Sequence, residues 1–278
     1  MKLKLLFFVS TVLFFVNGFS VEIILKDGQI SSGKIYLPCS FDSIEYECFF
    51  DSGAERSKVP LVGFEDFQKV GEYESGGAAG LRKKYDEVII GNLNVGEFSR
   101  VDFKIGRSQE MIEASPTIGS GFFSNSSLYF DFKHREIKQK HIPLENISSY
   151  PLKTLEGRPL IDVEIKASKL KGIWDTGAVL TTIDQDYIDK NLNSFIFIQD
   201  IEDGVDSTGT QVFLKLYILK EFYILTSKFE NIYILGMDFS PMRKLGVPTD
   251  IQFIIGYNSI IKSNWYFDYV NQLWAIED

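Results

Sequence analysis

A short segment occurs twice in this chain of 278 residues, and the repeat limits the fold more than any other feature. Phe49–Ala54 (FFDSGA) corresponds to Ile173–Ala178 (IWDTGA), at an offset of 124 residues. Each copy follows a stretch that predicts a hairpin, Tyr36–Phe50 in the first half and Leu160–Trp174 in the second. The centres of the two predicted turns also differ by 124 residues. The chain therefore contains two copies of one supersecondary unit.

A second pair of matching segments lies downstream in each half. Ile118-Gly119 corresponds to Ile255-Gly256, and the match continues without a gap to Tyr129–Asp131 and Tyr266–Asp268. The offset here is 137 residues, so the second half carries a net insertion of 13 residues between its two motifs. The duplication therefore extends over most of each half.

Beyond the first twenty residues, the chain consists of short apolar stretches broken by Gly, Asn, Asp and Pro. Several of them alternate with period two, as Val101–Ile105 and Leu160–Ile165 do, which is typical of half-buried strands. Helical periodicity is weak and is confined to short segments at 184–193 and 239–245. The pattern predicts an all-β fold.

Each half places an aspartate directly after bulky apolar residues, at Asp51 and Asp175. Burial of a carboxylate is costly unless it is paired or hydrogen-bonded. The glycine that follows lets backbone amides approach the carboxylate, and the intervening Ser or Thr supplies a hydroxyl that can fix the loop. A single copy would be an ordinary turn. Two equivalent copies related by a two-fold axis would bring the aspartates together.

Both motifs resemble the active-site signatures of the clan AA aspartic peptidases, the pepsins and retropepsins. The Ile-Gly segments are similar to the strand that crosses behind each active-site loop in that family. Val59-Pro60 follows Asp51 at the pepsin spacing, Tyr73–Gly80 is similar to the pepsin flap, and Tyr85–Gly91 is similar to the strand after it. The resemblance covers approximately residues 21–278.

The resemblance implies a two-lobed, pepsin-like double β-barrel that arose by internal duplication, with the active-site cleft between the lobes. Residues 21–148 would form the lobe with Asp51-Ser52-Gly53 and the flap. Residues 149–278 would form the lobe with Asp175-Thr176-Gly177. Because one chain supplies both aspartates, a monomer is expected.

The activity that the resemblance implies is that of an aspartic endopeptidase acting on a protein or peptide substrate. Two adjacent carboxyl groups share one proton and activate a water molecule, and no metal or cofactor is expected. The residues implied are catalytic Asp51 and Asp175, supporting Ser52, Gly53, Thr176 and Gly177, and flap residues Tyr73 and Gly76. Tyr73 has an equally weighted alternative role, that of a packing aromatic.

The chain departs from the pepsin pattern at several positions. Ala54 and Ala178 follow the two glycines, as in retropepsins, where pepsins usually carry Ser or Thr. Without those hydroxyls the carboxylates lose a stabilising hydrogen bond, so we expect a pH optimum less acidic than that of gastric pepsin. Lys58 stands where many pepsins have a tryptophan, and Tyr73 follows Asp51 at a shorter spacing than in pepsins.

The first twenty residues have the pattern of a secretory signal peptide. Lys2 and Lys4 precede the apolar run Leu5–Val16, and the small residues Gly18 and Ser20 predict cleavage after Ser20. An uncleaved anchor is the alternative, although the run is short for a membrane span. We therefore expect a secreted or periplasmic protein with no stable membrane span after cleavage.

The two cysteines, Cys39 and Cys48, lie on either side of the first predicted turn and could form a disulfide, which export permits. An unpaired buried pair is nearly as plausible. The net charge of −9 argues against nucleic acid as a partner. His134 and His141 are the only histidines, which leaves little material for a Ser-His-Asp triad or a histidine-based metal site.

Two other functions remain open at this point. A pepsin-like protein that has lost catalysis could bind a protein or glycan ligand, although both Asp-Ser/Thr-Gly triplets are intact. An unrelated exported β-sandwich would explain the strands and turns. It would not explain the duplicated aspartate motif or the flap-like segment.

Overall fold

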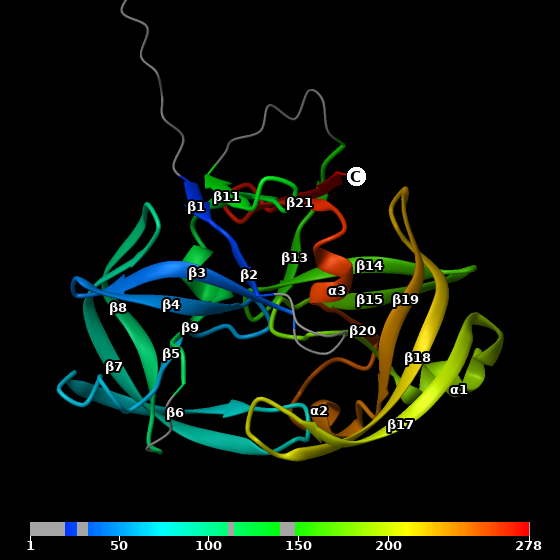
Figure 1. Cartoon of the computed structure of the whole chain (residues 1–278), viewed down its shortest axis with the longest axis horizontal. Helices are drawn as coiled ribbons and strands as arrows, with labels where there is room; N and C mark the ends of the chain where they lie inside the picture. The colour runs from blue at the N-terminus through cyan, green and yellow to red at the C-terminus, as the bar shows by residue number, and fades with distance from the viewer. Residues whose placement is uncertain (1–19, 27–32, 111–113, 140–147, 278) are drawn as a thin grey trace, which may run out of the picture.

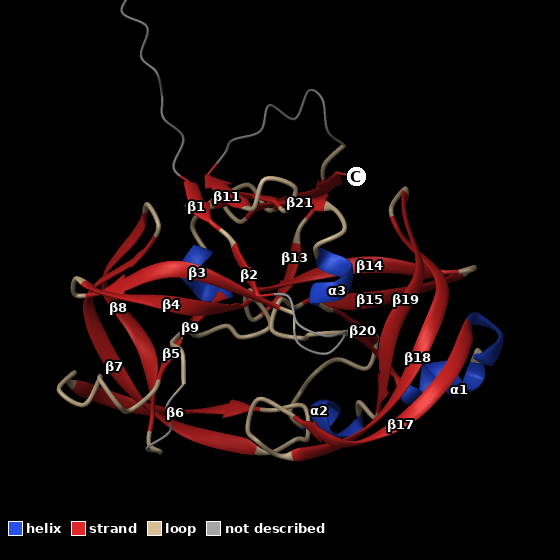
Figure 2. Cartoon of the chain, in the orientation of Figure 1, coloured by secondary structure: helices blue, strands red, loops and turns tan. Residues whose placement is uncertain are grey.

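The computed structural model describes residues 20–26, 33–110, 114–139 and 148–277. These residues form 22 strands in three sheets, with only short helical segments between them, so the predicted all-β class is confirmed (Figure 2). Two of the short helices, α1 (Gln185–Lys190) and α2 (Ser240–Lys244), lie within the segments predicted to be helical. A third, α3 (Tyr257–Ile260), was not predicted.

The first half forms an eight-stranded sheet with the order β2-β3-β4-β9-β5-β8-β7-β6 (Figure 1). Its strands are β2 (Ile24–Lys26), β3 (Lys34–Phe41), β4 (Ile44–Asp51), β5 (Lys58–Val59), β6 (Lys69–Gly76), β7 (Arg82–Val95), β8 (Phe98–Ser108) and β9 (Thr117–Gly119).

The second half forms another eight-stranded sheet, with the order β13-β14-β15-β20-β16-β19-β18-β17. Every strand has a counterpart at the same place in the first sheet, and the additional pairings β3–β7 and β14–β18 also correspond. Its strands are β13 (Lys153–Leu155), β14 (Arg158–Ile165), β15 (Ser168–Trp174), β16 (Thr181–Asp184), β17 (Phe195–Val205), β18 (Gln211–Ile224), β19 (Ser227–Met237) and β20 (Ile251–Ile255).

A six-stranded sheet joins the two halves, with the order β1-β11-β10-β21-β22-β12. At its centre β10 and β21 pair antiparallel, with Tyr129 opposite Tyr266. The Tyr-Phe-Asp repeats therefore lie side by side at the junction. Its strands are β1 (Ser20–Glu22), β10 (Ser127–Asp131), β11 (Glu136–Gln139), β12 (Tyr150–Pro151), β21 (Asn264–Asp268) and β22 (Leu273–Glu277).

The predicted hairpins form in both halves, as β3–β4 and β14–β15, and each turns within two residues, at 42–43 and 166–167, one position before the predicted turn centre. Asp42 and Ser43 adopt φ values of 45° and 78° between β3 and β4, and Lys166 adopts a φ of 54° between β14 and β15. Turns with positive φ match the right-handed twist of paired strands. Across the first hairpin the structure joins Cys39 and Cys48 in a disulfide, with a Cα–Cα distance of 5.9 Å.

Aromatic side chains from both halves pack together beneath the two aspartates. Phe50 and Trp174 are the residues immediately before Asp51 and Asp175, and both are buried. The ring of Phe130, from the six-stranded sheet, lies 5.8 Å from that of Phe50 and 5.0 Å from that of Trp174. Such contacts add about 0.5–1.5 kcal/mol per pair to the burial of apolar surface. The aromatic core thus fixes the strands that carry the aspartates.

The inserted residues of the second half fall mainly in one connection. Equivalent strands are offset by 129 residues at Arg82 and Gln211, the first residues of β7 and β18, but by 137 at the Ile-Gly segments. Eight of the inserted residues therefore lie in the part of the second half that includes α2.

Among the residues that the structure describes, no helix is long and apolar enough to cross a membrane. The predicted signal peptide, residues 1–20, lies outside the described residues except for Ser20, where β1 begins.

Candidate active site

Each aspartate is carried at the end of a strand that pairs in parallel with an Ile-Gly strand. In the first half Asp51 lies opposite Gly119, where β4 pairs with β9. In the second half Trp174 lies opposite Ile255, where β15 pairs with β20, and the amide of Asp175 donates to the carbonyl of Ile255 at 3.0 Å. The two central strands β9 and β20 are visible in Figure 1.

Glycine is required at the end of each Ile-Gly strand because the aspartate loop passes close to it. A Cβ atom at Gly119 would lie 2.8 Å from the carbonyl oxygen of Ala54. A Cβ atom at Gly256 would lie 2.6 Å from the carbonyl oxygen of Leu180. Any side chain at either position would displace the loop backbone.

A hydroxyl six residues after each aspartate ties the loop to the same glycine. The amide of Gly119 donates to Ser57 Oγ at 3.1 Å, and the amide of Gly256 donates to Thr181 Oγ1 at 3.2 Å. Both hydroxyl residues are buried. Sequence reasoning missed this pair, although the 124-residue offset relates Ser57 to Thr181.

The two aspartate loops are joined by a reciprocal set of hydrogen bonds. The amide of Ser52 donates to Thr176 Oγ1 at 2.9 Å, and the amide of Thr176 donates to Ser52 Oγ at 2.9 Å. Each hydroxyl then donates across to the other half, Ser52 to the carbonyl of Trp174 at 2.9 Å and Thr176 to that of Phe50 at 2.7 Å. Ser52 and Thr176 are both buried, so the network is shielded from water.

This network brings the two carboxyl groups together. A Cβ atom at Gly53 would lie 2.3 Å from Asp175 Cγ, and one at Gly177 would lie 2.3 Å from Asp51 Oδ1. The carboxyl groups of Asp51 and Asp175 are close enough for each to affect the pKa of the other. Backbone amides also point at them: Gly177 and Ala178 donate to Asp175 Oδ1 at 2.8 and 3.2 Å, and Ala54 donates to Asp51 Oδ1 at 3.1 Å.

The surroundings favour the protonated forms of both carboxyl groups. Burial raises the pKa of Asp175 to about 7, and the nearby charge of Asp51 adds to the effect. Burial also raises the pKa of Asp51, but the positive charge of Lys58 opposes that rise. Because the two groups interact, the pair titrates as a unit that retains one proton over a wide pH range.

The segment Tyr73–Gly80, predicted to be the flap, lies in the β6–β7 hairpin, and Tyr73 packs within its own half. Its ring stacks on that of Tyr85 at 5.4 Å, and the guanidinium of Arg56 lies 4.5 Å from its centroid. Its buried hydroxyl lies against Gly106 and has no hydrogen-bond partner among the described residues. These contacts are those of a packing aromatic.

Ser75, two residues closer to the tip than Tyr73, interacts with Lys58. The Nζ atom of Lys58 donates to Ser75 Oγ at 3.1 Å and lies 4.8 Å from the ring centroid of Tyr85. Burial lowers the pKa of Lys58, whereas the charge of Asp51 acts to raise it. Sequence reasoning assigned no role to Ser75, and the Lys58–Ser75 contact depends on how the hairpin folds back.

The tip of this hairpin meets the equivalent hairpin of the second half. The turn 77–81 between β6 and β7 corresponds to the turn 206–210 between β17 and β18, and the two lie close together in Figure 1. The amide of Ala79 donates to Asp206 Oδ2 at 2.8 Å. A Cβ atom at Gly77 would lie 2.2 Å from the same oxygen. The second hairpin was not predicted to take part in the site.

The tip of the β6–β7 hairpin also packs against the segment around α2. A Cβ atom at Gly76 would lie 2.5 Å from Leu245 Cδ1, and one at Gly80 would lie 2.9 Å from Pro241 Cβ. The guanidinium of Arg243, on α2, pairs with the buried carboxylate of Asp184. The inserted α2 segment is therefore anchored to the second half and presents a surface on which the hairpin rests.

An apolar cluster connects the hairpin tip to the second aspartate loop. Ala78 from the tip and Ala178 from the loop both pack against it. The other members all belong to the second half and are Leu214, Met237, Phe239, Met242 and Ile254.

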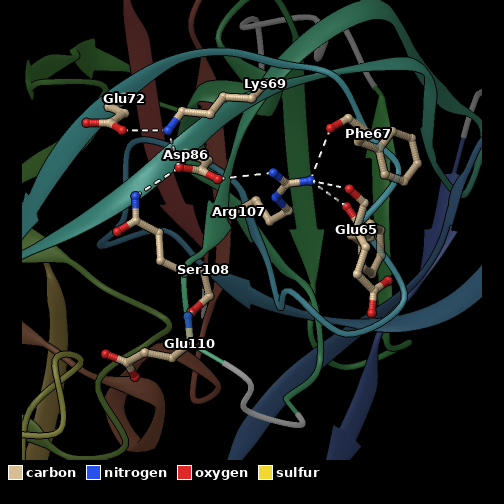
Figure 3. Close-up of polar contacts among 10 residues, drawn as sticks. Glu65, Phe67, Lys69, Glu72, Asp86, Arg107, Ser108 and Glu110 are labelled. Atoms are coloured by element: carbon tan, nitrogen blue, oxygen red, sulfur yellow. Dashed lines mark hydrogen bonds and ion pairs between the residues drawn. The ribbon is translucent and has the colours of Figure 1, made fainter.

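The base of the β6–β7 hairpin is held by Arg107 of β8 (Figure 3). Its guanidinium donates to the carbonyls of Phe64, Glu65 and Phe67 at 2.8–3.0 Å, and to Asp86 of β7 at 3.0 Å. Asp86 also pairs with Lys69, at the start of β6, at 2.9 Å. The connection that leads into β6 is therefore fastened to both β7 and β8.

Of the two histidines, the structure describes only His134, which pairs with an aspartate outside the candidate site. The Nδ1 atom of His134 lies 2.8 Å from Asp131 Oδ2, at the turn between β10 and β11, and its side chain is 63% exposed. His141 lies outside the described residues. Within the part of the chain that the structure describes, no group of three or more His, Cys, Asp or Glu residues could hold a metal ion.

Comparison with protein-family models and with curated proteins finds no match to this chain. The arrangement around Asp51 and Asp175 is therefore the basis for assigning a function.

Proposed function

We propose that this chain is a two-lobed, pepsin-like aspartic endopeptidase that hydrolyses protein or peptide substrates. One observation carries the proposal: two equivalent loops, related by the duplication, meet so that each aspartate lies against the glycine of the other loop, Asp175 against Gly53 and Asp51 against Gly177. The reciprocal bonds of Ser52 and Thr176 hold this arrangement from both sides. The matching eight-stranded sheets and the six-stranded sheet that joins them support the two-lobed assignment.

In the proposed reaction, the ionised member of the pair takes a proton from a water molecule between the two carboxyl groups. The water oxygen attacks the scissile carbonyl carbon while the protonated member donates its proton to the carbonyl oxygen. The resulting tetrahedral species collapses when the C–N bond breaks, and the leaving nitrogen accepts the proton that the first carboxyl group took from the water. A hydroxyl on the same carbon returns its proton to the second carboxyl group, so the pair regains its starting state and no covalent link to the protein forms.

The arrangement of the β6–β7 and β17–β18 hairpins favours an extended substrate. Their tips meet through Ala79 and Asp206, and the apolar cluster reaches from Ala78 to Ala178, beside the second aspartate. A peptide would lie between the hairpins and the aspartates, so the tips would separate to admit it. The Cys39–Cys48 disulfide supports the exported location that we propose, because such bonds persist in oxidising compartments.

The proposal is tested by incubating the purified protein with a denatured protein substrate across pH 3–7, with and without pepstatin. We expect pepstatin-sensitive cleavage that disappears in both Asp51→Asn and Asp175→Asn. Asp162→Asn is the matched control, because it makes the same chemical change at an exposed position on β14 and should retain full activity. A folded protein that cleaves at no pH would contradict the proposal and favour the non-catalytic binding protein.

A further inference from the structure

Lys58 and Asp51 project from the same face of the first eight-stranded sheet. Thr117 of β9 lies opposite both Phe49 of β4 and Lys58 of β5, so these three residues form a row across the sheet. Asp51 follows Phe49 by two positions and therefore shares its face. The alternate residues Phe50, Ile118 and Val59 are buried on the opposite face.

The ammonium group of Lys58 lies between this sheet face and the β6–β7 hairpin. The Oγ atom of Ser75 on β6 accepts a hydrogen bond from Lys58 Nζ at 3.1 Å, and the ring centroid of Tyr85 on β7 lies 4.8 Å from Nζ. The charged groups that act on it are Asp51 of β4 and Lys83 of β7. Lys83 is itself paired with Glu110 at 2.8 Å, and Asp51 is the carboxyl group whose charge acts on Lys58.

The second half has no counterpart of this charge. The position equivalent to Lys58 at the 124-residue offset is Thr182, which is neutral and buried. Its hydroxyl donates to the carbonyl of Leu180 at 3.1 Å. The backbone amides around the two aspartates are arranged in much the same way in both halves, so Lys58 breaks the approximate symmetry of the pair.

We propose that Lys58 is a positioning residue that keeps Asp51 as the ionised, water-activating member of the pair and leaves the shared proton on Asp175. A cation beside one of two coupled carboxyl groups stabilises the charge on that group in preference to the other. Ser75 holds the ammonium in place while the hairpin covers the site. The assignment of roles rests on the proposed peptidase function, whereas the electrostatic asymmetry does not.

The opposed pKa effects agree with this geometry. Burial raises the pKa of Asp51 and the charge of Lys58 offsets part of that rise, whereas burial and the charge of Asp51 both raise the pKa of Asp175. Burial lowers the pKa of Lys58, and the charge of Asp51 opposes part of that effect, so the two groups interact in both directions.

The first test compares the pH dependence of kcat/KM in the wild type, Lys58→Met and Lys58→Arg. Loss of the cation should move the acidic limb of the profile to higher pH by about half a unit to one unit. Lys58→Arg keeps the charge and should return the limb toward the wild-type position. A uniform loss of activity in Lys58→Met, with the limb unmoved, would reduce Lys58 to a packing role and overturn the inference.

A second test does not depend on catalysis. Carbon-13 NMR of labelled aspartate carboxyl groups follows both titrations, with Asp51→Asn and Asp175→Asn identifying the signals. In the wild type Asp51 should lose its proton at a lower pH than Asp175. Lys58→Met should narrow this gap between the two pKa values, and Lys58→Gln replaces that variant if it does not fold. An unchanged gap would overturn the inference even in an active enzyme. A narrowed gap in a protein without peptidase activity would uphold the asymmetry and reject the proposed function.

Discussion

Single side chains at the centre of this protein serve both halves at once. Ser52 and Thr176 each donate and accept hydrogen bonds across the junction, so neither loop is complete without the other. Their burial makes every one of these bonds difficult to replace with water. The hydroxyl groups, rather than the acidic groups, are therefore the main polar link between the two aspartate loops.

Removal of one hydroxyl should consequently destabilise the whole protein. Thr176→Ala leaves the buried amide of Ser52 without its acceptor and should lower the free energy of unfolding by about 1–3 kcal/mol. Thr176→Ser, the matched control, keeps the hydroxyl and should lose much less. Chemical denaturation of the two variants and the wild type measures the difference. Equal stability of the Ala and Ser variants would show that the network contributes little.

The titration of Asp175 should also appear in the stability of the protein. Its pKa rises from 3.8 in the unfolded chain to about 7 in the native state, so between these values the native state holds the extra proton. Stability should then fall as pH rises through this window, by about 3–4 kcal/mol. Asp175→Asn should flatten the dependence, and Asp162→Asn should not. Denaturation at pH 4, 5.5 and 7 measures the slope, and parallel slopes for wild type and Asp175→Asn would contradict the shifted pKa.

At the level of elements, the two long hairpins differ from the aspartate loops in how they are held. Arg107 fixes the base of the β6–β7 hairpin by four hydrogen bonds. The tip of that hairpin is held by the Ala79–Asp206 hydrogen bond and by close contacts of its glycines. Asp206 also organises its own turn, because it accepts bonds from the amides of Thr208 and Thr210 at 2.8 and 3.0 Å. A β6–β7 hairpin with a well-fixed base and few bonds at its tip is suited to act as a cover that opens over the proposed site.

Weakening the tip contact should therefore open the cover without unfolding the protein. Asp206→Ala removes the acceptor of the Ala79 amide and should speed hydrogen exchange in the turn 77–81 by about tenfold, while β7 stays protected. Asp200→Ala, at an exposed position on β17, is the control and should leave exchange in the turn unchanged. Mass-spectrometric exchange measures both. Unchanged exchange in Asp206→Ala would mean that the glycine contacts alone close the tips.

For the whole molecule, the six-stranded sheet and the shared aromatic core make the two halves interdependent. β10 and β21 pair directly, and the rings of Phe130 and Trp174 lie 5.0 Å apart although they come from different halves. Each half supplies one aspartate, one long hairpin and three strands of the joining sheet. One chain therefore contains everything that the proposed site needs.

It follows that the activity should not require association of chains. The specific activity is expected to stay constant when the protein is diluted a hundredfold, because both Asp51 and Asp175 belong to the same chain. Peptide-cleavage rates over that dilution series, with light scattering to record mass, provide the measurement. A steep loss of specific activity on dilution would indicate that a second copy completes the site.

Much of the fold and the aspartate pair could be predicted because they are encoded in short segments. Each hairpin turn, at 42–43 and 166–167, depends on a few neighbouring residues, and so do the Asp-Ser-Gly and Asp-Thr-Gly loops. The repetition of these segments indicates the duplication. The 124-residue offset even relates Ser57 to Thr181, although their hydrogen bonds become evident only in three dimensions.

The remaining features depend on which distant strands meet. Tyr73 faces Arg56 and Tyr85 instead of covering the aspartates, while Ser75 reaches Lys58, because pairing of β6 with β7 and of β5 with β8 and β9 sets which side chains share a face. The contact of Ala79 with Asp206 joins residues 127 positions apart, and the shift in offset between the halves hides the correspondence of the two turns in which they lie. Local patterns specify turns, strands and motifs, whereas long-range pairing determines which of them become neighbours.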